Sequence, residues 1–374
     1  MITKNKLKLA AGIAGTGWNF TSWMHKDMPD NANESVDFYI EQAQIAENAK
    51  FQTTFLFDVS HIGPGNIPHY LSMFDGATIM SAIAMKTSKI GLSFTAASSY
   101  TDPYNIARQA LSLDKISNGR ASVNVVTSNP GGMVNFSRGH LGKSDQYPMQ
   151  KEFMEIVLGL WDTYEDDAFP RNKATGEFLK PNKMHTINYR GKYFSVDGPL
   201  NLSRSVQGRP VLYTAGGSPA IVEIATTYTD GAFIAGHSLE DALYTANALR
   251  SKLREKNRNP ENFVVATSQN AIVGKTDTEA QQKYMELVSL NRYRAMPAPL
   301  FFGSAERVAN QVQQWYEAGA MDMLIINQDY PTGLADFAEL VVPILQERGV
   351  FHTEYEADTL RGNLELKKPE FRKI

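Results

Sequence analysis

The stretch IGLSFTAASSYTDPYNIARQALSLDKISNGRASVNVVTSN, residues 90–129, contains one complete unit of the pattern from which the fold can be predicted. Residues 90–98 form an apolar run typical of a buried strand, and residues 103–116 have apolar side chains at helical spacing. Pro103 suits a first helical turn, because its missing N–H would have no partner there. A second apolar run, Ala121 to Val126, completes a predicted strand–helix–strand unit.

The same alternation runs along the whole chain. We expect strands at 7–14, 53–59, 90–98, 121–126, 210–217, 231–236, 263–273 and 321–328, and helices at 34–49, 73–86, 103–116, 150–164, 238–255, 276–290, 304–318 and 333–348, with a further helix beginning at Ser218. Strictly alternating units predict a parallel sheet, and about eight of them favour a (β/α)8 TIM barrel. The sequence is therefore interpreted as a single α/β barrel domain over residues 1–374.

A doubly wound sheet is the structural alternative to the barrel. Such a sheet commonly carries a G-x-G-x-x-G turn after its first strand, where it binds a dinucleotide. Here the turn reads GIAGTG at residues 12–17, which does not match, and the chain has no Walker-type loop. The barrel is the preferred prediction.

Two regions lie outside the repeating pattern. Residues 162–209 are rich in charge, proline and glycine around HTINYRGKYFSVDGPL, which predicts a β-hairpin excursion turning at residues 190–192, between units 4 and 5. Residues 349–374 are expected to form a C-terminal tail, with a solvated basic end. We interpret 162–209 as an insertion into the scaffold and not as a linker between domains.

Composition excludes several classes of function. The chain has 374 residues, a net charge of −3 and no cysteine, so disulfides, thiolate catalysis and cysteine metal sites are excluded. The charge favours neither nucleic acid nor an anionic membrane as a partner. No apolar segment approaches transmembrane length, and we expect a cytoplasmic location.

The predicted strand ends are neutral and polar. Asp58 and Asp329 are the only acids there, whereas hydroxyls and amides such as Thr95, Asn124 and Ser128 are frequent. A glycosidase needs two carboxylates across one bond, and a metal hydrolase needs clustered histidines and carboxylates. The seven histidines are scattered, so we expect no metal site. A rim of this kind favours a polar organic cofactor that brings its own reactivity.

The segment AGGSPAIVEIA, residues 215–225, leaves two interpretations open. Ser218 and Pro219 are typical of a plain helix cap. Alternatively, Gly217 lets the backbone approach a ligand and Ser218 binds a phosphate at the positive end of the helix.

The chain resembles the nitrilotriacetate, EDTA and dibenzothiophene-sulfone monooxygenase family, a branch of the bacterial-luciferase-like flavin enzymes. The likeness covers nearly the whole chain and rests on AQIAENAKFQTTFLFD, TAASSYTDPYNIARQALSLDKISNGRASVNVVTS, LGLWDTYEDDA, GKYFSVDGPLN and FHTEYEADTLRGNL. The second and last of these are long, ordered and specific.

This resemblance implies an FMN-binding barrel that receives reduced FMN from a separate flavin reductase. With O2, such an enzyme oxygenates a small nitrogen- or sulfur-containing organic substrate, and homodimers or homotetramers are usual. By position, Asp58 and Thr95 match residues near the flavin ring system, and Asn124 would lie beside the isoalloxazine. Tyr147 and Ser218 match the ribityl-phosphate end. The expected cofactor-binding set is Asp58, Thr95, Asn124, Ser128, Lys143, Tyr147, Gly217 and Ser218.

Departures from the family pattern keep two alternatives open. Lys143 stands where relatives have histidine, in KSDQY instead of H-D-E-R-Y, although a lysine still offers phosphate a point charge. Only residues 291–303 stand where relatives have a long insertion that covers the pocket. The alternatives are a non-catalytic flavin-binding protein and an oxidoreductase that uses the deazaflavin F420. Candidates for a catalytic role are His25, His61 and His237.

Overall fold

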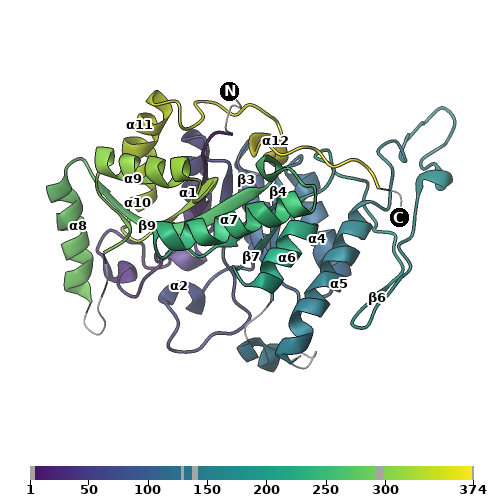
Figure 1. Cartoon of the computed structure of the whole chain (residues 1–374), viewed down its shortest axis with the longest axis horizontal. Coiled ribbons are helices and arrows are strands. Elements are labelled where there is room, and N and C mark those ends of the chain that lie inside the picture. Colours follow the sequence, from purple (N-terminus) through teal and green to yellow (C-terminus); the bar gives the residue numbers. More distant parts are fainter. Residues whose placement is uncertain (1–4, 128–129, 137–141, 292–295, 297, 373–374) are drawn as a thin grey trace.

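Eight parallel strands close into a barrel in the computed structural model, which describes residues 5–127, 130–136, 142–291, 296 and 298–372 (Figure 1). The barrel strands are β1 (Lys8–Gly12), β2 (Thr53–Leu56), β3 (Gly91–Ala97), β4 (Ala121–Val126), β7 (Val211–Ala215), β8 (Gly231–Ile234), β9 (Val264–Gly274) and β11 (Met323–Gln328). Pairing of β8 with β9 closes the ring, and β10 (Phe301–Ser304) pairs with the second half of β9. The predicted (β/α)8 barrel is confirmed.

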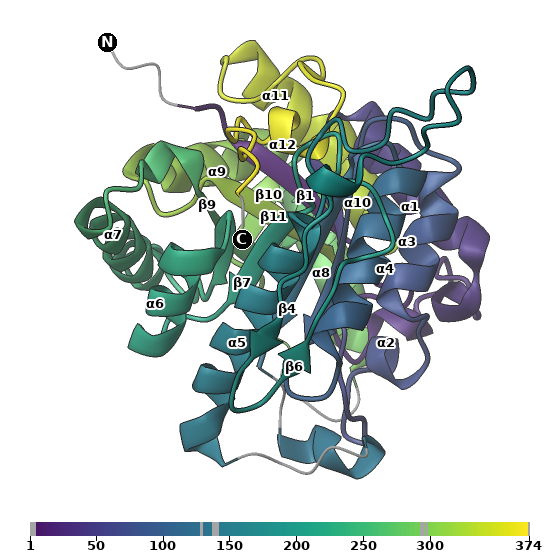
Figure 2. The same cartoon turned by 90° about the vertical axis from the view of Figure 1, so that its right-hand side faces the viewer.

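Helices surround the strands, with α1, α3 and α4 on one flank (Figure 2). The outer helices are α1 (Val36–Asn48), α3 (Gly76–Ala84), α4 (Pro103–Ile116), α5 (Lys143–Trp161), α6 (Pro219–Tyr228), α7 (Leu239–Glu255), α8 (Asp277–Leu290) and α9 (Ala305–Ala318). The final segment contains α10 (Gly333–Asp336), a π-helical turn (Phe337–Val341) and α11 (Val342–Glu347). Short helices α2 (Pro68–Leu71) and α12 (Leu360–Asn363) lie outside this pattern.

Two predicted helices differ from the structure. The helix expected at 150–164 begins at Lys143 and contains Pro148, a residue that usually ends a helix and therefore hid its first turns. The helix expected at 333–348 is interrupted by the π-helical turn. In the described ranges, no helix is long and apolar enough to span a bilayer.

The barrel interior is packed with large side chains. Alternate residues of each strand point inward, and Phe55, Tyr213 and Phe233 meet there with ring centroids 4.5 and 4.9 Å apart. Leu360 and Leu364 of the C-terminal segment join the same buried cluster. This segment therefore plugs the end of the barrel where the strands begin.

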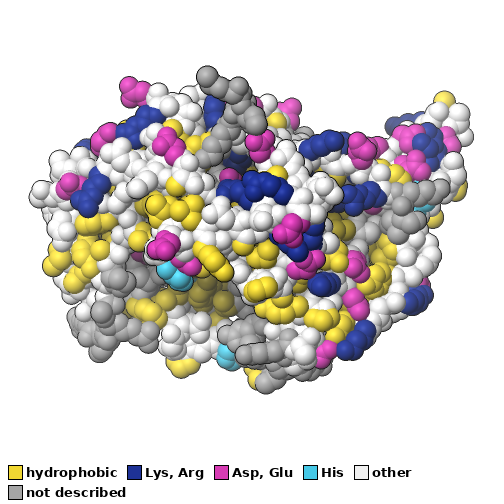
Figure 3. Space-filling view, viewed as in Figure 1, with side chains coloured by type: hydrophobic (Ala, Val, Ile, Leu, Met, Phe, Trp, Pro, Cys, Tyr) yellow, Lys and Arg dark blue, Asp and Glu magenta, His cyan; other side chains and the backbone are white. Residues whose placement is uncertain are grey.

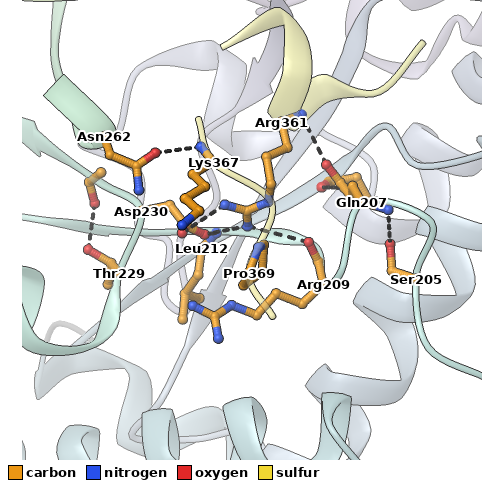
Figure 4. A network of polar contacts seen from close by, with 12 residues as sticks. Ser205, Gln207, Arg209, Leu212, Thr229, Asp230, Asn262, Arg361, Lys367 and Pro369 are labelled. Carbon is orange, nitrogen blue, oxygen red and sulfur yellow. Dashed lines mark hydrogen bonds and ion pairs between the residues drawn. The ribbon is translucent and has the colours of Figure 1, made fainter. Parts of the chain in front are cut away.

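An ion pair fixes the plug to the barrel (Figure 4). Arg361 donates to both carboxylate oxygens of Asp230, over 2.9 and 2.8 Å, and both residues are buried. Burial alone would raise the pKa of Asp230, but the guanidinium holds this pKa well below its usual range. The backbone N–H of Arg361 donates to Gln207 at 3.0 Å.

The 162–209 excursion contains the expected hairpin. Strands β5 (Tyr189–Arg190) and β6 (Ser195–Val196) pair antiparallel beside the barrel, at the right of Figure 1. The buried pair Arg204–Asp162, with Nε and Oδ1 2.9 Å apart, joins the two ends of the excursion. The insertion is thus held at its base and does not disturb the order of the strands.

Candidate functional site

A cavity of about 410 Å³ lies where β2, β3 and β4 end. Asp58 follows β2, Thr95 belongs to β3, Thr127 follows β4, and His61 comes from the loop after β2; all four line the cavity. Active sites of barrels lie at the carboxyl ends of the strands, so this cavity is in the expected place. In Figure 3 few charged side chains are visible at the lower left and centre of this face outside the grey residues, whereas Lys, Arg, Asp and Glu side chains are visible along its top and at its lower right.

Asp58 is the titratable group most clearly changed by this environment. Burial, with a smaller contribution from the neighbouring carboxylate of Asp75, raises the pKa of its carboxyl to about 6. The backbone N–H of Val59 donates to Oδ1 at 2.7 Å and opposes the shift. A carboxyl with a pKa near 6 can accept or donate a hydrogen bond close to neutral pH.

Thr95 and Asn124 form a polar pair beside Asp58. The Thr95 hydroxyl donates to the Leu56 carbonyl at 3.1 Å and accepts weakly from Asn124 Nδ2 at 3.5 Å. Asn124 Oδ1 is buried and lacks a hydrogen-bond partner. A buried acceptor without a donor is unfavourable, so this atom suits a ligand that brings an N–H group.

Tyr147 of α5 and Ser218, the residue that precedes α6, lie next to each other. Their hydroxyl oxygens are 3.4 Å apart, and Ser218 also caps α6 by accepting from the Ile221 N–H at 3.4 Å. The helix-cap interpretation is therefore correct, and it leaves both hydroxyls beside the positive end of a ten-residue helix. A Cβ at Gly217 would lie 3.1 Å from Thr245, so the backbone is closely packed there.

The structure brings only one of the three candidate histidines to this cavity. His61 lines it. His25 lies elsewhere, with Nε2 3.5 Å from Glu286 and Nδ1 accepting from the Asp27 N–H. His237 is exposed before α7. Of the other predicted residues, Ser128 lies outside the described residues, and Lys143 is described only as the first residue of α5.

Sequence reasoning missed a buried histidine near the same strand ends. His69 lies in α2 with its ring centroid 4.9 Å from that of Trp18, and neither ring nitrogen has a hydrogen-bond partner. Burial lowers the pKa of His69 to about 4, so the ring is neutral at pH 7. The sequence offered no signal for the burial of His69, because this residue is not part of any metal-binding or catalytic motif.

Many unpartnered buried polar atoms gather at this end of the barrel. They include Thr16 Oγ1, both ring nitrogens of His69, Ser99 Oγ, Asn124 Oδ1 and Gln150 Oε1. Native proteins leave few such groups, so their concentration indicates that a polar ligand completes the site. In the described part of the chain, no three side chains of metal-binding type are placed to hold an ion. The donor and acceptor set fits a flavin, whose ring edge and phosphate offer both kinds of partner.

A family model for luciferase-like monooxygenases matches residues 18–320. The chain belongs to this family and is therefore an oxidoreductase of the flavin-dependent monooxygenase class.

Individual relatives match over nearly their full length. N-acetyl-S-(2-succino)cysteine monooxygenase of Bacillus subtilis is 37% identical, with 98% of each chain covered. Nitrilotriacetate monooxygenase component A of Aminobacter aminovorans is 30% identical, with 95% of each covered. The alignment with the Bacillus subtilis protein spans 432 positions, more than the 374 residues of this chain. The Bacillus subtilis protein therefore contains segments that this chain lacks.

Solved structures agree with this assignment. EDTA monooxygenase from Chelativorans sp. BNC1 superposes with a TM-score of 0.87 at 26% identity, covering 97% of this chain and 99% of that one. A riboflavin lyase with modified FMN and riboflavin has a TM-score of 0.89 at 26% identity, with 98% of each chain covered.

Proposed function

We propose that the protein is the oxygenating component of a two-component system. It binds reduced FMN delivered by a separate flavin reductase and uses O2 to oxygenate a small organic molecule at nitrogen or sulfur. The observation that carries this proposal is the cavity at the strand ends, which is lined by Asp58 and Thr95, with Asn124 next to Thr95 and its buried Oδ1 unpartnered. Bound reduced FMN supplies the electrons that activate O2.

The chain's own residues bind and orient the cofactor. Asn124 Oδ1 would accept a hydrogen bond from the flavin ring system, and Asp58 would donate or accept one there. Tyr147 and Ser218 bind the phosphate at the N-terminus of α6, where backbone N–H groups and the helix dipole favour an anion. Ser128 and Lys143 complete the expected cofactor-binding set, and Lys143, which stands where relatives have histidine, would offer the phosphate a point charge.

Proton supply is assigned to His61, because it is the candidate histidine that lines the cavity. The His61 imidazole is exposed at the cavity wall and would move a proton through a ring nitrogen. His25 is better placed for a structural role, since its Nε2 faces Glu286 and its Nδ1 is occupied by a backbone N–H.

Relatives support the substrate class. Named substrates of similar proteins are N-acetyl-S-(2-succino)cysteine, nitrilotriacetate and dibenzothiophene sulfone, each with sulfur or nitrogen between carbon atoms. Among these, the most similar of the relatives described above acts on a thioether, so a thioether carrying carboxylates is the first substrate to test.

The experiment combines purified protein, FMN, NADH, a flavin reductase and N-acetyl-S-(2-succino)cysteine under 18O2. We expect substrate-dependent incorporation of one 18O atom, detected by mass spectrometry, and none when the protein or the reductase is omitted. The same mixture with nitrilotriacetate tests an amine. Failure to bind reduced FMN at micromolar concentration would refute the proposal. Selective binding of F420 would support the deazaflavin alternative, and FMN binding without oxygenation of any tested substrate would support a non-catalytic flavin protein.

A further inference from the structure

Three arginines near the base of the barrel lack a carboxylate of their own. Arg209 lies just before β7, Arg258 follows α7, and Arg372 belongs to the C-terminal segment. In the described part of the chain none of the three forms an ion pair, in contrast to Arg361 and Arg204 beside them. Cations that are removed from water are normally paired, so this group of arginines calls for an explanation.

Arg209 is the clearest case of the three. Its Nε is buried and has no hydrogen-bond partner, and its guanidinium makes no hydrogen bond to any described residue. Figure 4 shows its side chain beside the Arg361–Asp230 pair. The dashed line at Arg209 reaches only its backbone carbonyl, which accepts from Arg361 Nη2 at 3.4 Å. A buried N–H without an acceptor on a charged group is costly.

The two carboxylates nearest to Arg209 are already engaged. Asp230 accepts from both Nη atoms of Arg361, and Asp162 accepts from Nε of Arg204 at 2.9 Å. Both carboxylates favour the charged form of Arg209, but neither lies within ion-pair distance of it. Among the described residues, the Arg209 guanidinium therefore has no counter-ion in contact with it.

The three positive charges act on one another. Burial lowers the pKa of Arg209 against the attraction of Asp230, with smaller contributions from the charges of Arg361 and Arg372. Burial also lowers the pKa of Arg258, and the charge of Arg372 acts in the same direction. Arg372 is thus within electrostatic reach of both other arginines. We call Arg209, Arg258 and Arg372 the basal arginine cluster.

The cluster has donors to offer and is open to solvent. Arg258 Nη1 and Nη2 donate to the carbonyls of Thr226 and Thr229, each at 2.8 Å, which fixes the guanidinium without neutralising it. Arg209 and Arg258 are partly exposed and Arg372 is exposed, so an ion can enter from solvent. Guanidinium N–H groups form a fork that matches the oxygens of phosphate.

We propose that the basal arginine cluster binds a doubly charged oxyanion of the phosphate type. Arg209 and Arg372 donate to its oxygens, and the charge of Arg258 adds to the attraction. The three arginines come from separate segments, so the bound ion joins the C-terminal tail to the barrel and stabilises the folded chain. The cluster lies where the strands begin, at the opposite end of the barrel from the flavin cavity, and the proposal does not depend on the proposed function.

The test compares the wild type with R209Q, R372Q and R254Q at pH 8, in inorganic phosphate and in chloride of equal ionic strength. Arg254 is exposed on α7 and has no ion pair to a described residue, so R254Q controls for the loss of a surface cation. S218A alters the proposed FMN phosphate site and separates the two places where phosphate could bind. Calorimetric titration gives the Kd for phosphate, urea unfolding gives the stability, and circular dichroism reports folding. R372Q removes an exposed side chain and keeps the test available should R209Q fail to fold.

We expect phosphate to raise the urea midpoint of the wild type above its value in chloride. R209Q and R372Q should each weaken phosphate binding about tenfold or more, the effect of losing a charge-assisted hydrogen bond, and should reduce the rise in midpoint. R254Q and S218A should change neither. A wild type that does not bind phosphate, or binding that both R209Q and R372Q retain, would overturn the proposal. Binding that S218A abolishes would assign phosphate to the flavin site, and an equal loss in R254Q would reduce the effect to net charge; either result would also overturn it.

Discussion

Replacing Asp58 with asparagine should stabilise the protein at pH 8 while weakening FMN binding. Burial raises the pKa of the Asp58 carboxyl from 3.8 to about 6. Above pH 6 the group is ionised in both the folded and the unfolded chain, and the folded state bears the cost of the buried charge. A shift of about two pKa units corresponds to about 3 kcal/mol. Below pH 3.8 the carboxyl is protonated in both states and carries no such cost. The folded state therefore loses stability as the pH rises from 3.8 through 6.

Because the side chain also meets solvent in the cavity, we expect D58N to gain about 1–3 kcal/mol at pH 8 and about 1 kcal/mol or less at pH 4.5. Urea unfolding at both pH values measures the gain, and titration with FMN measures the affinity. S35A is the control. Ser35 caps α1 by accepting from the Phe38 N–H at 3.3 Å and does not line the cavity, so loss of this cap should cost about 1 kcal/mol at both pH values. A D58N gain that is absent at pH 8, or equal at the two pH values, would refute the reasoning.

Three further predictions follow from contacts described above. Y147F and S218A should each weaken FMN binding about tenfold, since a hydrogen bond to a charged group contributes about 1.5 kcal/mol or more; unchanged affinity in a quenching titration would remove both hydroxyls from the phosphate site. R361A should lower the free energy of unfolding in urea by about 3–5 kcal/mol, because it removes the guanidinium that donates to both carboxylate oxygens of the buried Asp230; wild-type stability would contradict this. H61A should lower turnover about 100-fold and H25A by less than about threefold, if proton transfer belongs to the cavity histidine; the reverse order in steady-state assays would reassign that role.

The barrel could be predicted because each of its units carries local signals. Apolar runs such as 121–126 and helix starts such as Pro103 depend on neighbouring residues alone, and the structure reproduces both. The same reliance on local signals misplaced the start of α5. Proline usually ends a helix, but α5 continues through Pro148, so its first turns were not predicted.

The candidate site was less accessible to sequence reasoning. Neutral strand ends indicated a cofactor, and Asp58 and Thr95 do line the cavity. Which histidine faces that cavity depends on the path of the loops, and the sequence treats His61 and His25 alike. The Arg361–Asp230 pair joins residues 131 positions apart and has no local signature. The same holds for the packing of the C-terminal segment, which the sequence presents only as a basic tail.

The plug at the base of the barrel has a consequence for the order of events during protein synthesis. Leu360, Arg361 and Leu364 are translated after all eight strands, so a nascent chain presents a barrel whose base is still open to water. Until those residues leave the ribosome exit tunnel, Asp230 lacks the guanidinium that bonds both of its oxygens, and the inner face of β7 and β8 lacks its cover. A chain that stops before residue 360 would therefore carry every strand of the barrel and still present an exposed apolar opening, the kind of surface that chaperones and proteases recognise.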